Sequence, residues 1–111
     1  MKDCVFCKII KGEIGKLILK NENFVVFESI EPKAKVHLLI VPKKHIVDMD
    51  SIEADEFKIL TELFPLIQKI SKQFNLKNGY RLVVNQGTDA GQSIQHLHFH
   101  LLGGEKLSFA L

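Results

Sequence analysis

Short apolar runs along the chain predict five β-strands. Each run is rich in β-branched and aromatic residues and is bounded by Gly, Pro, Asn or charged residues, as strands commonly are. The runs cover residues 17–20, 24–28, 36–41, 80–85 and 96–102. Only Asn21-Glu22-Asn23 separates the first run from the second, so these two are expected to form a hairpin. The pattern predicts an antiparallel sheet.

One longer segment, residues 51–74, has helical periodicity. Its apolar residues recur three or four positions apart and leave the charged residues on the opposite face. They are Phe57, Leu60, Leu63, Phe64, Ile67, Ile70 and Phe74. Pro65 lies inside the segment and lacks an amide hydrogen, so it should either kink or split this helix. A short helix is expected near the N-terminus, ended by Gly12.

These elements predict a single α+β domain over residues 1–111: a five-stranded antiparallel sheet with one long and one short helix. The contents of 46% hydrophobic and 25% charged residues are those of an ordinary globular chain. A net charge of +2 is too small to wrap a polynucleotide, although small anionic ligands remain possible. No run is long enough to span a bilayer, and the N-terminus does not resemble a signal peptide. We expect a cytoplasmic protein that binds neither nucleic acid nor membrane.

Three alternating histidines mark the last predicted strand. Side chains alternate along a strand, so His96, His98 and His100 should share one face while the intervening apolar residues pack into the core. A merely polar outer face would more naturally use Lys, Glu or Thr. A single zinc ion cannot reach all three in a straight strand, because the outer pair would be about 13 Å apart at the backbone. Two of them could share an ion.

A catalytic interpretation of the histidines also fits the loop before them. A neutral imidazole is a nucleophile near neutral pH, and a neighbouring imidazole can donate a proton to a leaving group. Asn85, Gly87, Gly91 and Ser93 offer an amide, close backbone approach and a hydroxyl, which are groups that bind phosphate oxygens. Such residues occur in most turns, so the loop gains meaning only from the histidines that follow it.

The cysteine pair Cys4 and Cys7 has the spacing of metal ligands, because two intervening residues let both thiolates face one ion. A redox motif is disfavoured, since no βαβ context precedes it. Two buried structural cysteines remain an alternative. Zinc is the interpretation that we favour.

The run His96-Leu97-His98-Phe99-His100-Leu101-Leu102 resembles the signature of the histidine-triad (HIT) nucleotide-binding family. The resemblance extends to Cys4–Glu13, Pro32–Ile46 and Asn78–Gly104, which is nearly the whole chain. The sequence is most similar to the purine nucleoside phosphoramidase branch. Relatives are homodimers that join two sheets into one of ten strands, and this resemblance implies the same here.

The resemblance implies a role for each polar residue of the site. His98 would attack the α-phosphorus of a purine nucleotide of the AMP or GMP type, and water would hydrolyse the nucleotidyl-histidine. His100 would bind and neutralise phosphate oxygens, and His37 would support His98. Ser93 would contact the leaving group or phosphate, and Asn85 the phosphate or ribose. On strand context alone, the alternative for His37 is a histidine hydrogen-bonded within the sheet.

The remaining expectations for the nucleotide pocket also come from the resemblance. Its nucleotide contacts would include Phe6, Phe27, Ser29, Ile30, Gly91 and Gln92. Two positions depart from the family pattern. Ser29 stands where relatives usually have an Asp that contacts the ribose hydroxyls, and a neutral hydroxyl is a weaker partner. Phe109 stands where relatives often have Trp, in a tail that reaches toward the partner subunit's site.

The resemblance further implies a structural zinc site. Some relatives with this cysteine pair complete the site with the histidine of the Pro-Lys-Lys-His segment and the first histidine of the triad, here His45 and His96. Cys4, Cys7, His45 and His96 would then form a closed four-ligand site. An exposed histidine in a basic turn is the alternative for His45. No catalytic metal is expected.

The leading functional hypothesis is hydrolysis of adenosine or guanosine phosphoramidates, including adenylylated lysine. A nucleotide-binding scaffold protein is the first alternative. A hydrolase of dinucleoside polyphosphates, from another branch of the family, is the second.

Overall fold

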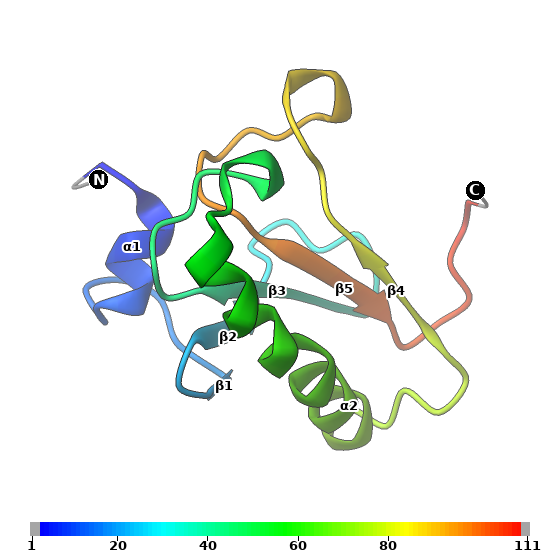
Figure 1. Cartoon of the computed structure of the whole chain (residues 1–111). Helices are drawn as coiled ribbons and strands as arrows, with labels where there is room; N and C mark the ends of the chain where they lie inside the picture. Colours follow the sequence, from blue (N-terminus) through cyan, green and yellow to red (C-terminus); the bar gives the residue numbers. More distant parts are fainter. Residues whose placement is uncertain (1–2, 110–111) are drawn as a thin grey trace.

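The computed structural model describes residues 3–109, and its centre is one antiparallel sheet (Figure 1). The strands are β1 (Leu19–Lys20), β2 (Phe24–Glu28), β3 (Val36–Pro42), β4 (Tyr80–Val83) and β5 (Phe99–Gly103). They are ordered β1-β2-β3-β5-β4, and every neighbouring pair is antiparallel. The predicted α+β class, hairpin and five-stranded sheet are confirmed.

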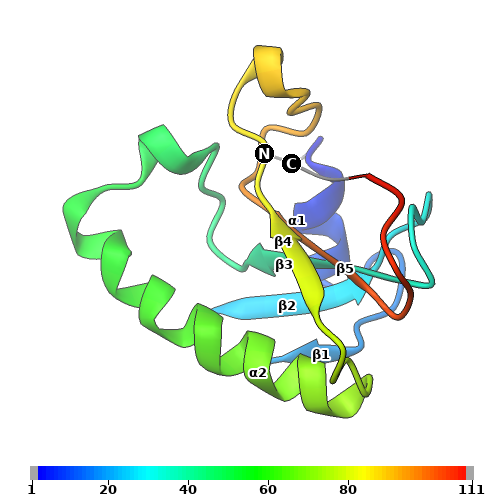
Figure 2. The same cartoon turned by 90° about the vertical axis from the view of Figure 1, so that its right-hand side faces the viewer.

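Helices cover both faces of the central strands. The helix α2 (Leu63–Gln73) crosses one face, and α1 (Val5–Ile10) lies on the other (Figure 2). On β2, Phe24 and Val26 pack toward α2, whereas Val25 and Phe27 pack toward α1. Burial on both faces explains why β2 and β3 are nearly continuous apolar runs.

Pro65 splits the helix predicted over residues 51–74. A short 3-10 turn, η1 (Met49–Ser51), is followed by the 3-10 helix η2 (Ala54–Glu62), and the α-helix starts only at Leu63. Pro65 is therefore the third residue of α2, in the first turn, where no intrahelical partner is needed for its missing amide hydrogen. An α-helical turn before it would bring its ring against the carbonyl of Thr61, and the 3-10 geometry avoids that arrangement.

The last strand is shorter than predicted, and this correction changes the geometry of the histidines. Strand β5 begins at Phe99, so His96 and His98 lie in an irregular segment before it. The His98 side chain hydrogen-bonds to the backbone of His96, which competes with regular strand pairing. Leu97, Phe99 and Leu101 are nevertheless buried in the core beneath α2, as the alternation predicted.

The N-terminal helix ends as predicted. Gly12 has a positive φ of 80°, and the amides of Gly12 and Glu13 donate to the carbonyls of Ile9 and Lys8. This arrangement caps the free carbonyls of α1 and favours glycine at that position. None of the helices within residues 3–109 is long and apolar enough to cross a membrane.

Candidate functional site

A cavity of about 990 Å³ lies on the α1 side of the sheet. It is walled by α1, by β2 and β3, by the loop before β5, and by the C-terminal segment. The predicted site residues that line it are Phe6, Phe27, Ser29, Ile30, His37, Asn85, Gly91, Ser93, His98 and His100. Segments far apart in the sequence therefore bring nearly the whole predicted set to one hollow.

His98 is held with one ring nitrogen directed away from the backbone. Its Nδ1 lies 2.8 Å from the carbonyl oxygen of His96. A carbonyl only accepts, so Nδ1 carries the proton and the lone pair is on Nε2. The ring is buried, with Phe6 edge-on at 5.0 Å and His100 at 5.1 Å between ring centroids. His98 thus has the tautomer of a nucleophile.

A chain of hydrogen bonds sets the tautomer of His100 as well. The backbone amide of Lys33 donates to Nδ1 of His37 at 3.0 Å, so the proton of His37 is on Nε2. That Nε2–H donates to Nδ1 of His100 at 2.9 Å. His100 must then carry its own proton on Nε2, where it is a donor for an anionic ligand. His37 and His100 are diagonal neighbours in the β3–β5 register, which pairs Leu39 with His100.

Burial keeps these two imidazoles neutral. Burial first, and then the neighbouring His98 and His37, lower the pKa of His100 to about 4. Burial and, after it, the positive charge of Lys33 lower the pKa of His37. Near neutral pH His37 and His100 are therefore neutral rings that bind by hydrogen bonding.

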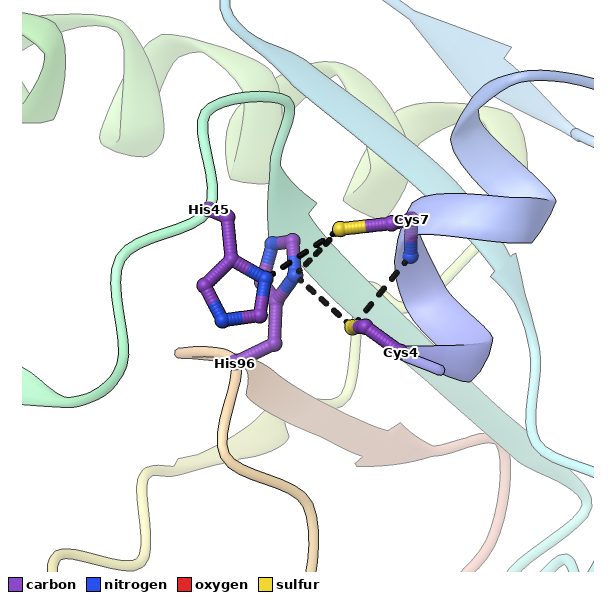
Figure 3. A group of neighbouring side chains, drawn as sticks. All are labelled: Cys4, Cys7, His45 and His96. Atoms are coloured by element: carbon purple, nitrogen blue, oxygen red, sulfur yellow. Dashed lines mark hydrogen bonds between the residues drawn. The ribbon is translucent and has the colours of Figure 1, made fainter. Parts of the chain in front are cut away.

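A second cluster joins Cys4, Cys7, His45 and His96, and their ligand atoms lie within 4.8 Å of one another (Figure 3). Cys7 Sγ is 3.2 Å from Nδ1 of His45 and 3.6 Å from Nδ1 of His96, and Cys4 Sγ is 3.4 Å from Nδ1 of His96. A tetrahedral zinc ion places nitrogen and sulfur ligands roughly 3.6 Å apart, so this donor set fits one ion. The cluster can bind a metal.

The backbone prepares His96 as a ligand. Its Nε2 lies 2.8 Å from the carbonyl oxygen of Pro42, so Nε2 carries the proton and Nδ1 is free to face the thiols. Burial lowers the pKa of His96 and keeps it neutral. Burial, and after it the neighbouring Cys4, raises the pKa of the Cys7 thiol. At neutral pH this thiol would therefore lose its proton only when a cation binds to it.

Some partners in the site were not predicted from the sequence. The carbonyl of Pro42 and the amide of Lys33 are main-chain groups, and no side-chain pattern marks them. Arg81 was also missed: its Nη2–H donates to the carbonyl of Phe109 at 2.8 Å, and its guanidinium lies 4.5 Å from the Phe109 ring centroid. This contact places Phe109 on the cavity wall.

Two predicted nucleotide contacts, Gln92 and Ser29, have hydrogen-bond partners within the chain. Gln92 is not among the residues that line the cavity; its amide donates to the carbonyls of Val47 and Ile94, and its side-chain oxygen accepts from the Gly87 amide. This supports the loop. Ser29 lines the cavity, and its hydroxyl accepts from the Glu31 amide at 3.2 Å. Its role toward a sugar stays a prediction.

Comparison with known proteins now decides the family, because residues 12–107 match the HIT domain. The chain belongs to the HIT family. A HIT-like protein of Chlamydia trachomatis is 46% identical over 101 residues, which cover 90% of this chain and 91% of that protein.

Solved HIT structures share the fold. A histidine triad protein from Clostridium difficile superposes with a TM-score of 0.93 at 36% identity, covering 100% of this chain and 98% of that one. A HIT family hydrolase from Legionella pneumophila gives 0.89 at 38% identity, with 96% and 97% covered. A histidine triad nucleotide-binding protein from Candida albicans gives 0.80 at 36% identity, with 89% and 73% covered. This HIT protein therefore has the fold of a hydrolase-type enzyme.

Proposed function

We propose that this HIT protein hydrolyses purine nucleoside phosphoramidates, in which a nucleoside 5′-monophosphate is linked to an amine such as lysine. The observation that carries the proposal is the tautomer of His98: its proton is on the backbone side, and its lone pair is on Nε2. The ring of His100 lies beside that of His98 and carries its own proton on Nε2, where it can donate. The names of a related hydrolase and of a related nucleotide-binding protein support this choice of reaction and ligand.

In the first step, Nε2 of His98 attacks the phosphorus and the bond from phosphorus to the amine nitrogen breaks. The amine takes up one proton from solvent water near the exposed Ser93 hydroxyl, and the nucleotide is transferred to His98. His100 donates from Nε2 to a phosphate oxygen, where negative charge increases in the transition state. His37 keeps His100 in the donor tautomer.

In the second step, water attacks the same phosphorus and breaks its bond to His98. The nucleoside monophosphate leaves, the water proton returns to solvent, and Nε2 regains its lone pair. No metal takes part in either step. The apolar wall formed by Phe6 and Phe27 would contact the base, and Asn85 is available for phosphate or ribose.

The four-ligand cluster is proposed to hold zinc in a structural role. Cys4 is the N-cap of α1 and Cys7 lies within it, His45 follows β3, and His96 precedes β5. A bound ion would therefore tie the N-terminal helix to two central strands. Its proposed ligands do not line the large cavity, so catalysis and metal binding use separate residues.

A homodimer is also proposed, with β4 as the strand that pairs. The sheet ends at β1 and β4, and β1 has only 2 residues whereas β4 has 4. Pairing β4 with its copy would extend the sheet to ten strands and cover an exposed edge. Light scattering coupled to size exclusion would give the mass of a single chain if this proposal is wrong.

The deciding experiment is steady-state hydrolysis of a fluorogenic adenosine phosphoramidate by wild type and by His98→Ala, with zinc measured on the same samples. We expect the variant to lose about 10³-fold or more in kcat and to keep its zinc and fold. Binding of AMP without turnover by wild type would indicate a nucleotide-binding scaffold instead. Preferential cleavage of a dinucleoside polyphosphate would indicate the other branch of the family.

A further inference from the structure

One residue connects the metal cluster to the proposed active site. The side chain of His96 faces Cys4 and Cys7, while its main-chain carbonyl accepts the Nδ1–H of His98 at 2.8 Å. The ring is further fixed by the carbonyl of Pro42. Any change in the position of the His96 main chain therefore acts directly on the bond that sets the tautomer of His98.

Phe6 forms a second link between the two sites. It lies between Cys4 and Cys7 in the sequence, so an ion bound to both cysteines restricts the first turn of α1. Its buried ring is edge-on to His96 at 5.9 Å and to His98 at 5.0 Å between centroids. The cysteines thereby also fix one wall against which the nucleophile packs.

The cluster is accessible from outside but buried on the side of His98. Cys4, Cys7 and His45 are half-buried, and a depression of about 350 Å³ is lined by Cys4, His45 and Ser93 among others. His96, in contrast, is 0% exposed. An ion could be removed or replaced from the solvent side, while the consequence of its loss falls on the buried residue that holds His98.

We infer that metal occupancy of the Cys4–Cys7–His45–His96 cluster regulates the proposed hydrolysis by holding His98 in its reactive tautomer and orientation. The inference rests on the proposed function. His96 is a positioning residue, acting through its carbonyl. The core between the sheet and α2 is a separate cluster of apolar side chains, so loss of the ion should loosen α1 and His96 without unfolding the chain.

The first test compares the zinc-loaded protein with the same protein after removal of zinc by a chelator. The ion is not expected to contact the nucleotide, so its removal should lower kcat on the order of tenfold or more, with KM and AMP affinity changed by only about twofold. Adding zinc back should restore kcat. A purely structural role would instead lower the active fraction and unfolding temperature without changing the kcat of the folded molecules.

Nuclear magnetic resonance of the imidazole nitrogens supplies a readout that needs no turnover. In the zinc-loaded protein, His98 should be in the single tautomer protonated at Nδ1, and in the zinc-free protein it should populate both tautomers. An unchanged His98 spectrum after removal of zinc would overturn the inference even if activity fell. If the loaded protein shows no turnover at all, the proposed function fails, and the spectrum still decides the coupling.

Variants at His45 separate the ion from the His96 backbone, because His45 is a proposed ligand that contacts Cys7 and does not line the cavity of His98. His45→Ala should reduce zinc affinity and kcat together at limiting zinc. His45→Cys supplies another good zinc ligand and should restore both. Lys43→Ala, an exposed neighbour outside the cluster, is the matched control and should change neither. A His45→Ala protein without zinc but with wild-type kcat would contradict the inference.

Discussion

His96 and His98 are two positions apart in the sequence, and they show opposite tautomers. The proton of His96 is on Nε2, directed at the carbonyl of Pro42, and its free Nδ1 faces two thiols. The proton of His98 is on Nδ1, directed at the carbonyl of His96, and its free nitrogen is Nε2. Two identical side chains in the same short segment therefore have the tautomers that their two proposed roles require, metal binding for His96 and nucleophilic attack for His98.

The difference shows that main-chain carbonyls assign chemistry to these histidines. A carbonyl can only accept, so its position decides which ring nitrogen keeps a lone pair. Both rings are buried, at 0% exposed for His96 and 8% for His98, so burial alone does not separate their roles. What separates them is the surroundings of each ring: His96 lies in the cysteine cluster, whereas His98 lies beside His100.

The largest expected effect is on the free energy of unfolding, which should differ between variants of His96 and of His98. His96→Ala removes a fully buried ring, its hydrogen bond to Pro42 and a proposed metal ligand. We expect it to lower the free energy of unfolding of the zinc-loaded protein by about 3 kcal/mol or more. His98→Ala should cost only about 1 kcal/mol, because the cluster is left intact. Urea unfolding with zinc analysis checks both values.

A zinc-free control tests whether the metal causes this difference. With zinc removed from both proteins, the gap between His96→Ala and His98→Ala should shrink to the packing and hydrogen-bond contribution of the His96 ring. Equal unfolding free energies of the two loaded variants would show that the cluster contributes nothing to stability.

The sequence was sufficient to predict most of the fold because its signals are local. Apolar runs and turn residues predicted the sheet, and Gly12 predicted the end of α1. The segment 51–74 was recognised as helical, but its division at Pro65 depends on which turn the proline joins, and periodicity does not determine that. The predicted start of β5 at His96 was wrong because the His98 side chain hydrogen-bonds to the backbone where a regular strand was expected.

The chemistry of the site was predictable only as a set of residues. The alternating histidines and the cysteine spacing identified the groups, and the family resemblance divided them between metal and ligand. Their tautomers were not predictable, because they depend on main-chain groups such as the Pro42 carbonyl and the Lys33 amide. Main-chain groups of this kind occur all along any chain, so the sequence does not mark the ones that matter. Nor did any pattern connect Arg81 to Phe109, since that contact depends on the path of the C-terminal segment.

A smaller effect is expected where a side chain, not a carbonyl, sets the tautomer. His37→Leu removes the donor to Nδ1 of His100, so His100 can adopt either tautomer. The kcat should fall about tenfold, less than the ~10²-fold or more expected for a donor that touches the transition state. His37→Gln keeps a donor and should retain more activity than His37→Leu. Equal kcat for His37→Leu and wild type would show that His100 needs no support from His37.

The last effect concerns the response of the pocket to acid. Burial lowers the pKa of His100 to about 4, below the ordinary value of 6.5 that applies in the unfolded chain. Between these values the unfolded chain binds more protons, so the free energy of unfolding should decrease as the pH falls from 6.5 toward 4. Burial shifts the pKa of His37 in the same direction.

This acid response can be assigned to the pocket by working with zinc-free protein, because ligand protonation in the loaded cluster would also destabilise the fold at low pH. Urea unfolding of wild type and His100→Gln should then give a shallower pH dependence for the variant across the window from 6.5 to 4, since glutamine does not titrate. Identical slopes would mean that His100 is protonated as readily in the fold as outside it. The lowered pKa of His100 would then be wrong, while the assignment of His96 to the metal cluster would be unaffected.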